Sequence, residues 1–69
     1  MVDTRKLKAR IVEQGLTQKE VRTMMGLTKR QFEIRIEKKN FDAEEIYKLL
    51  DILEIDDPKP IFFAAEVTR

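Results

Sequence analysis

The sequence predicts an all-α fold, a compact bundle of four to five helices, followed by a short extended or strand-like C-terminal tail. The same helix-start pattern occurs four times within 69 residues. Glycine or a pair of lysines stands where three of these helices would end. Apolar residues recur at the three- and four-residue spacing that gives a helix one buried face.

Each predicted helix begins with an apolar residue, then a threonine or aspartate, and has a second apolar residue in its first turns. This arrangement is a hydrophobic staple around an N-cap, whose side-chain oxygen accepts a free backbone N–H. The four N-caps are Asp3, Thr17, Thr28 and Asp42, and the capping-box partners of the last three are Glu20, Gln31 and Glu45. One such match is weak, but four in a short chain strongly predict four helices.

The predicted helix ends agree with these starts. Gly15 ends the first helix and Gly26 the second, because glycine readily adopts the left-handed conformation of a helix C-terminus. The third helix ends at Lys38-Lys39-Asn40, where cations suit the negative end of the helix dipole. The fourth helix carries an apolar stripe that requires burial. Its members are Ile46, Leu49, Leu50 and Leu53.

Residues 1–55 form the predicted helical domain, and residues 56–69 form an acidic linker and an apolar tail of the same domain. Proline in the Asp56–Pro60 stretch stops the fourth helix, because it removes a donor and restricts its predecessor. The apolar run from Ile61 to Ala65 then forms a short strand or an extended strap.

This tail either folds back over the fourth helix or meets the same segment of a second copy. We expect one phenylalanine to cover the core and the rest to form a weak dimer seam. The predicted dimer-interface residues are Ile61, Phe62, Phe63, Ala65 and Val67.

Charge is unevenly distributed along the chain, although the net charge is only +1. Residues 1–41 hold eleven basic residues (lysine or arginine) and five acidic residues, a net charge of +6. Residues 42–69 hold three basic and eight acidic residues, a net charge of −5. This asymmetry favours a basic face for a polyanion, with the acidic part turned away from it. A solvated surface that happens to be segregated is an equal alternative on charge alone.

The second and third predicted helices have the spacing of a helix-turn-helix, since their N-caps Thr17 and Thr28 are eleven residues apart around a glycine turn. In the third helix, Phe32 and Ile36 share the inward face, while Arg30 and Ile34 lie on the opposite side. In a DNA-binding helix-turn-helix, such outward residues reach base edges in the major groove.

The residue types fit this interpretation. Arg30 and Lys29 suit guanine, Gln31 suits adenine, and Ile34 suits the thymine methyl group. Gln18 at the start of its helix is suited to contact a DNA phosphate. Lys38 and Lys39 are suited to contact a neighbouring phosphate, and the alternative for these two lysines is cationic capping of the helix end. The predicted DNA-binding residues are Thr17, Gln18, Thr28, Lys29, Arg30, Gln31, Glu33, Ile34, Lys38 and Lys39.

The chain from about Leu7 to Leu53 resembles the Cro/repressor-type helix-turn-helix family, also called the xenobiotic-response-element family. The resemblance is carried by Thr17-Gln18, Val21, Met25-Gly26-Leu27-Thr28, Phe32, Arg35-Ile36 and Lys38-Lys39. It implies a phage or mobile-element regulator that binds operator DNA, usually as a dimer. It also implies that Gln18, Lys29, Arg30 and Ile34 contact DNA.

Two features depart from the family pattern. Arg22 stands where the family usually has alanine, at the seam between the two helices, so its stem would lie along the seam with the guanidinium in water. Glu33 and Glu37 border the reading face and oppose phosphates, although a carboxylate there can accept from cytosine.

Composition argues against several other classes. The chain has no cysteine and no histidine, which removes disulfides, thiol chemistry, the commonest general base and the commonest metal ligand. It contains no glycine-rich phosphate loop, no recognisable signal peptide and no apolar run of membrane-spanning length. We therefore expect no enzymatic activity, cofactor, metal or small-molecule substrate, no membrane partner, and a cytoplasmic, nucleoid-associated protein.

The sequence thus predicts a sequence-specific, double-stranded DNA-binding transcriptional regulator, acting as a homodimer at least on DNA. The alternative is a protein-binding helix-turn-helix module, such as a phage antirepressor or assembly factor. Steep loss of binding with salt would favour DNA, and salt-insensitive binding to a protein through Ile34 would favour the alternative.

Overall fold

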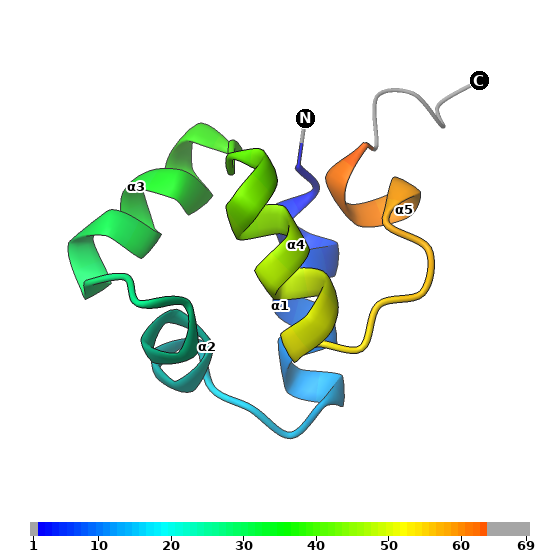
Figure 1. The fold of residues 1–69 in the computed structure, drawn as a ribbon, viewed down its shortest axis with the longest axis horizontal. Coiled ribbons are helices and arrows are strands. Elements are labelled where there is room, and N and C mark those ends of the chain that lie inside the picture. The colour runs from blue at the N-terminus through cyan, green and yellow to red at the C-terminus, as the bar shows by residue number, and fades with distance from the viewer. Residues whose placement is uncertain (1, 64–69) are drawn as a thin grey trace.

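The chain folds into five helices within residues 2–63, the part that the computed structural model describes (Figure 1). They are α1 (Thr4–Glu13), α2 (Gln18–Met25), α3 (Lys29–Lys38), α4 (Ala43–Ile52) and α5 (Lys59–Phe62). Helix α4 crosses in front of α1, with α3 on one side of this pair and α5 on the other (Figure 1). The predicted all-α bundle is therefore confirmed.

All four predicted N-caps are present. The Asp3 carboxylate accepts the backbone N–H groups of Arg5 and Lys6 at 3.1 and 3.2 Å. Thr17, Thr28 and Asp42 each form a complete capping box with the residue three positions on. The helix starts are fixed locally, because each cap satisfies backbone donors that have no partner inside the helix.

The helix ends also lie close to the predicted positions. Gly26 ends α2 with φ +78°, and Gly15 follows the end of α1 with φ +72°. Helix α3 ends at Lys39, which has φ +54° although it is not glycine. A side chain in this left-handed region is strained, so Lys39 holds its conformation at a cost in stability.

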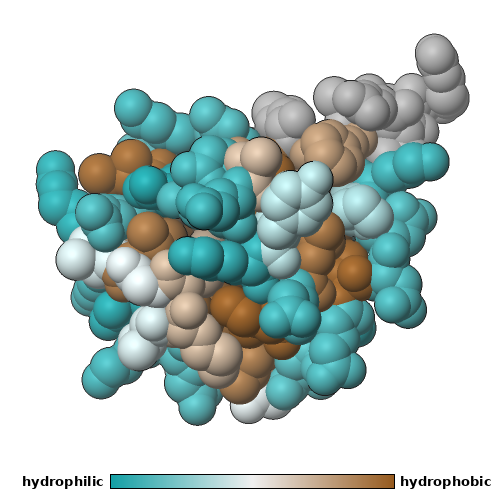
Figure 2. Space-filling view, in the orientation of Figure 1, coloured by the Kyte–Doolittle hydropathy of each residue, from teal (hydrophilic) through white to brown (hydrophobic). Residues whose placement is uncertain are grey.

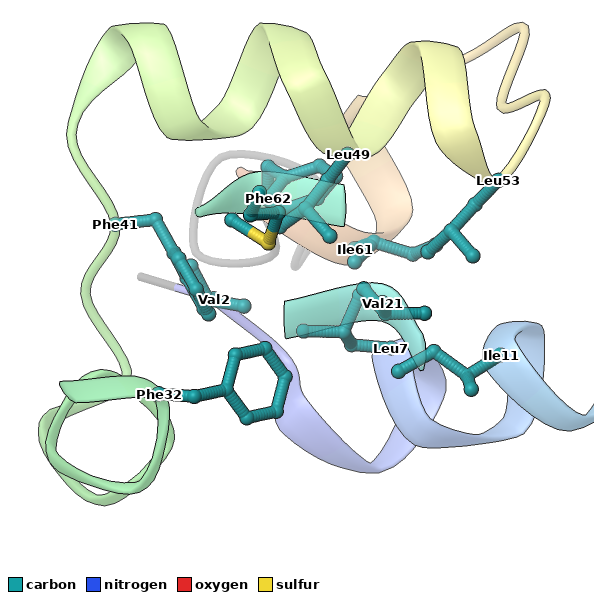
Figure 3. Close-up of a cluster of buried hydrophobic side chains, with 11 residues drawn as sticks. Val2, Leu7, Ile11, Val21, Phe32, Phe41, Leu49, Leu53, Ile61 and Phe62 are labelled. Atoms are coloured by element: carbon teal, nitrogen blue, oxygen red, sulfur yellow. The ribbon is translucent and has the colours of Figure 1, made fainter. Parts of the chain in front are cut away.

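One hydrophobic core joins all five helices (Figure 3). Leu7, Leu49 and Leu53 are fully buried and Phe62 is 2% exposed, so α1, α4 and α5 meet at the centre of this core. Phe32 from α3 packs against Phe41, with the ring centroids 6.1 Å apart. The predicted stripe of α4 is confirmed, since Ile46 and Leu50 pack at the border of the core.

The region after Pro58 differs from the prediction of an extended tail. Residues 59–62 form the short helix α5, with Pro60 in its first turn, where a missing N–H breaks no helical hydrogen bond. The Ile61 carbonyl accepts the Asp3 N–H at 2.6 Å, which ties α5 to the start of α1. The fourth helix ends before this stretch as expected, but a short helix follows where a strand or an extended strap was predicted.

This placement corrects part of the predicted dimer interface. Ile61 is 8% exposed and Phe62 is 2% exposed, and both belong to the core of their own chain. Neither is free to form a seam with a second copy. Phe63 is exposed, whereas Ala65 and Val67 lie outside the described residues.

Two arginines connect different helices. The Arg10 guanidinium donates to the carbonyls of Leu53 and Glu54 at 2.9 and 2.7 Å, at the C-terminal end of α4. Arg35 on α3 donates to the Glu45 carboxylate on α4 at 2.6 Å.

Between residues 2 and 63, none of the helices has the length and apolar character needed to cross a lipid bilayer.

Candidate nucleic-acid interface

Helices α2 and α3 form the predicted helix-turn-helix. The left-handed Gly26 reverses the chain, and the Leu27 N–H closes the turn on the Arg22 carbonyl at 2.9 Å. Leu27 packs on the core, and Thr28 caps α3 directly afterwards. As a result α3 lies at one side of the molecule, at the left of Figure 1 and on the opposite side of the α1/α4 pair from α5.

The two faces of α3 separate as helical rotation predicts. Phe32 is 2% exposed, and Ile36 packs against the core. Lys29, Arg30 and Lys38 are exposed. Ile34 is half-buried but does not belong to the core cluster. The residues selected from the sequence for base contacts are therefore not required to hold the core together.

Three of the predicted site residues are occupied in capping. The Thr17 and Thr28 hydroxyls accept the N–H groups of Glu20 and Gln31, each at 3.1 Å. The Gln31 side-chain oxygen in turn accepts the Thr28 N–H at 2.9 Å. A bidentate contact with adenine would use this same oxygen, so Gln31 is less suited to reading a base than Arg30 or Ile34.

A cleft of about 250 Å³ opens between α2 and α3. It is lined by Gln18, Lys19, Arg22, Lys29, Phe32 and Glu33. Among the predicted site residues, the structure thus brings Gln18, Lys29 and Glu33 to one place. Sequence reasoning did not include Lys19 and Arg22 in the site. The four-residue spacing of Gln18 and Arg22, which places both on one side of α2, was the signal that could have revealed Arg22.

The other end of α3 carries a second group of cations. Lys38 and Lys39 are exposed at its C-terminal end. The Val2 N–H donates to the Lys39 carbonyl at 3.2 Å, which places the start of α1 beside this end. The first turns of α1 bear the exposed Arg5 and Lys6, two further basic residues that sequence reasoning left out of the site.

Arg35 links α3 to α4. Its Nε donates to Glu45 Oε2 at 2.6 Å, and its Nη1 donates to the Gln31 carbonyl at 3.1 Å. The side chains of both ion-pair partners are largely covered, with exposures of 29% for Arg35 and 12% for Glu45. Arg35 is therefore a positioning residue for the exposed face of α3, since its charge is already matched.

No protein-family model matches the chain, and no match was found among curated proteins or solved structures.

Proposed function

We propose that this protein is a sequence-specific regulator of transcription that inserts α3 into the major groove of double-stranded DNA. The observation that carries the proposal is the division of α3 between a buried side, with Phe32 at 2% exposure, and an exposed side with Lys29, Arg30 and Lys38. A helix held only along its inner side leaves its outer side free for base edges.

The dimensions of α3 suit this role. Its ten residues span about 15 Å, and the major groove is about 12 Å wide. The helix can therefore reach across the groove, with basic residues near the phosphates on each side. Arg30 and Lys29 would contact guanine, Ile34 would contact a thymine methyl group, and the lysines at the C-terminal end would contact phosphates.

The resemblance to Cro/repressor-type proteins supports a repressor acting at the nucleoid as a homodimer. One short helix makes few base contacts, so specific binding generally requires two modules about one DNA turn apart. An exposed apolar region is available for pairing, around a groove of about 350 Å³ between α4 and α5. Figure 2 shows this hydrophobic surface beside α4.

Selection of bound sites from random DNA duplexes tests the proposal directly. We expect an enriched motif with two related half-sites about 10 base pairs apart. Binding to that motif should weaken by orders of magnitude between low and physiological salt, as counterions return to the phosphates. Absence of duplex binding even at low salt would refute the proposal.

A protein-binding module is the second candidate, and exposed apolar side chains favour it. Met24 on α2 is 54% exposed, and Ile34 on α3 is half-buried outside the core. A protein partner on this face would be held by apolar contact. Its binding would change little with salt and would be lost on Ile34→Asp, whereas DNA binding would show the steep salt dependence described above.

A further inference from the structure

Three arginines are half-buried in the described part of the chain, namely Arg10, Arg22 and Arg35. Arg22 differs from the other two in its hydrogen bonds. Arg10 donates to two backbone carbonyls at the end of α4, and Arg35 donates to Glu45 and to a carbonyl of its own helix. Within residues 2–63, Arg22 has no side-chain hydrogen bond and no ion pair, since the two ion pairs found there join Arg10 to Glu13 and Arg35 to Glu45.

The position of Arg22 directs its side chain to the site. Its neighbour Val21 is fully buried, so this part of α2 is fixed by the core. Arg22 itself lines the cleft between α2 and α3, together with the buried Phe32 of α3. Arg22 is half-buried, and no buried side-chain polar atom in the described chain lacks a partner, so its unbonded guanidinium is accessible to water.

The cleft has the charge of an anion-binding site. Lys19, Arg22 and Lys29 line it, and Glu33 is the one acid among the lining residues. A guanidinium presents a rigid fork of donors that matches the oxygens of a phosphate. Because its acceptor is not supplied by residues 2–63, an external oxyanion is the partner that this arrangement suits.

We propose that Arg22 binds a phosphate of the DNA backbone in the cleft between α2 and α3. The inference rests on the proposed function, which brings the exposed face of α3 to the major groove. The first helix of a DNA-bound helix-turn-helix crosses the backbone, so a residue on α2 meets phosphate before it meets a base. Lys19 and Lys29 reinforce the contact, and Glu33 opposes it by repulsion.

The test is a comparison of Arg22→Met with Arg22→Lys on a DNA site selected with the wild-type protein. Methionine keeps the apolar stem and removes the charge. We expect Arg22→Met to reduce affinity about tenfold or more at low salt and to lower the slope of log affinity against log salt by about 0.9, the contribution of one phosphate. Arg22→Lys should restore the slope but only part of the affinity, because lysine lacks the bidentate fork.

Two controls make the result specific. Lys59→Met removes one exposed positive charge from α5, on the opposite side of the molecule from α3, and should leave the slope unchanged. Glu33→Gln should increase affinity, because it removes the negative charge that lines the same cleft. Thermal unfolding of Arg22→Met should match the wild type, which separates loss of a phosphate contact from loss of the fold.

The outcomes distinguish this inference from the proposed function. If the wild type binds DNA and Arg22→Met lowers affinity and salt slope no more than Lys59→Met does, the role of Arg22 is overturned. DNA binding by the protein would then still stand. A relaxed preference at one base pair in Arg22→Met would also overturn the role of Arg22, since phosphate contacts carry no sequence information. No duplex binding by the wild type would overturn both.

Discussion

Single residues on α3 separate the side that packs in the core from the side proposed to contact DNA. Phe32 and Arg30 lie two positions apart, yet Phe32 is 2% exposed and Arg30 is exposed. A change on one side of the helix should therefore alter stability, and a change on the other should alter binding. Helical rotation made this division predictable from the sequence, because it depends only on spacing along one element.

Arg30→Ala should weaken binding to the preferred site by about 1–3 kcal/mol and relax the preference at one base pair. Its melting temperature should stay close to that of the wild type, because Arg30 is exposed. Phe32→Ala is the matched stability control and should lower the free energy of unfolding by about 3–5 kcal/mol. Calorimetry and titration of selected duplexes measure both quantities. A large fall in melting temperature for Arg30→Ala would contradict the assignment.

Lys39 combines an unfavourable backbone conformation with a proposed phosphate contact. Its φ is +54°, so Lys39→Gly should raise the free energy of unfolding by about 1 kcal/mol. The same change removes a cation and should weaken binding to all DNA sequences alike. Glu54, with φ +52°, lies just after the C-terminal end of α4. Glu54→Gly should give the same stabilisation without weakening binding. Equal affinity of Lys39→Gly and the wild type would exclude Lys39 from the DNA interface.

At the scale of elements, local signals were predictable and long-range ones were not. The N-caps and capping boxes involve residues two or three positions apart, so the sequence displays them directly. The contacts of Arg10 with the end of α4 span more than forty residues and depend on tertiary packing. Helix α5 was missed for a related reason. Its buried Ile61 and Phe62 cover the core, and this burial stabilises a single turn that local propensity would not.

The Arg35–Glu45 ion pair sets the relation of α3 to α4, and its loss should reduce both stability and DNA affinity. Glu45 accepts the Asp42 N–H with one oxygen and Arg35 with the other. Glu45→Gln keeps an acceptor for the cap but removes the charge opposite Arg35. Because Glu45 is only 12% exposed, we expect a loss of about 1–3 kcal/mol of unfolding free energy.

Glu44→Gln provides the control, since Glu44 is exposed in the same turn of α4. It removes the same charge and should have an effect within about 0.5 kcal/mol. Chemical denaturation of the two variants compares them directly. Equal stability of Glu45→Gln and Glu44→Gln would show that the ion pair does not hold α3 in place.

On the scale of the whole molecule, the charge split follows the architecture. Residues 1–41, with a net charge of +6, supply α1, α2 and α3, and the acidic remainder supplies α4 and α5. The proposed DNA-binding helix thus belongs to the basic part. The apolar groove at α4 and α5 belongs to the acidic part, which repels phosphate, so DNA should not occupy it.

Two copies would pair through the groove between α4 and α5 or through the tail after Phe63. Truncation after Pro60 does not test pairing, because it removes Ile61 and Phe62 from the core and should unfold the protein. Pairing through the groove between α4 and α5 is better tested with Tyr47→Lys, since Tyr47 is 71% exposed and lines this groove with Phe63. The variant should fold normally and sediment as a monomer. On a palindromic site it should bind with lower affinity and less cooperativity than the wild type.

A second variant that ends at Phe63 keeps α5 and tests Ala65 and Val67 separately. If both variants bind the palindromic site as dimers with undiminished affinity, neither the groove nor the tail takes part in pairing.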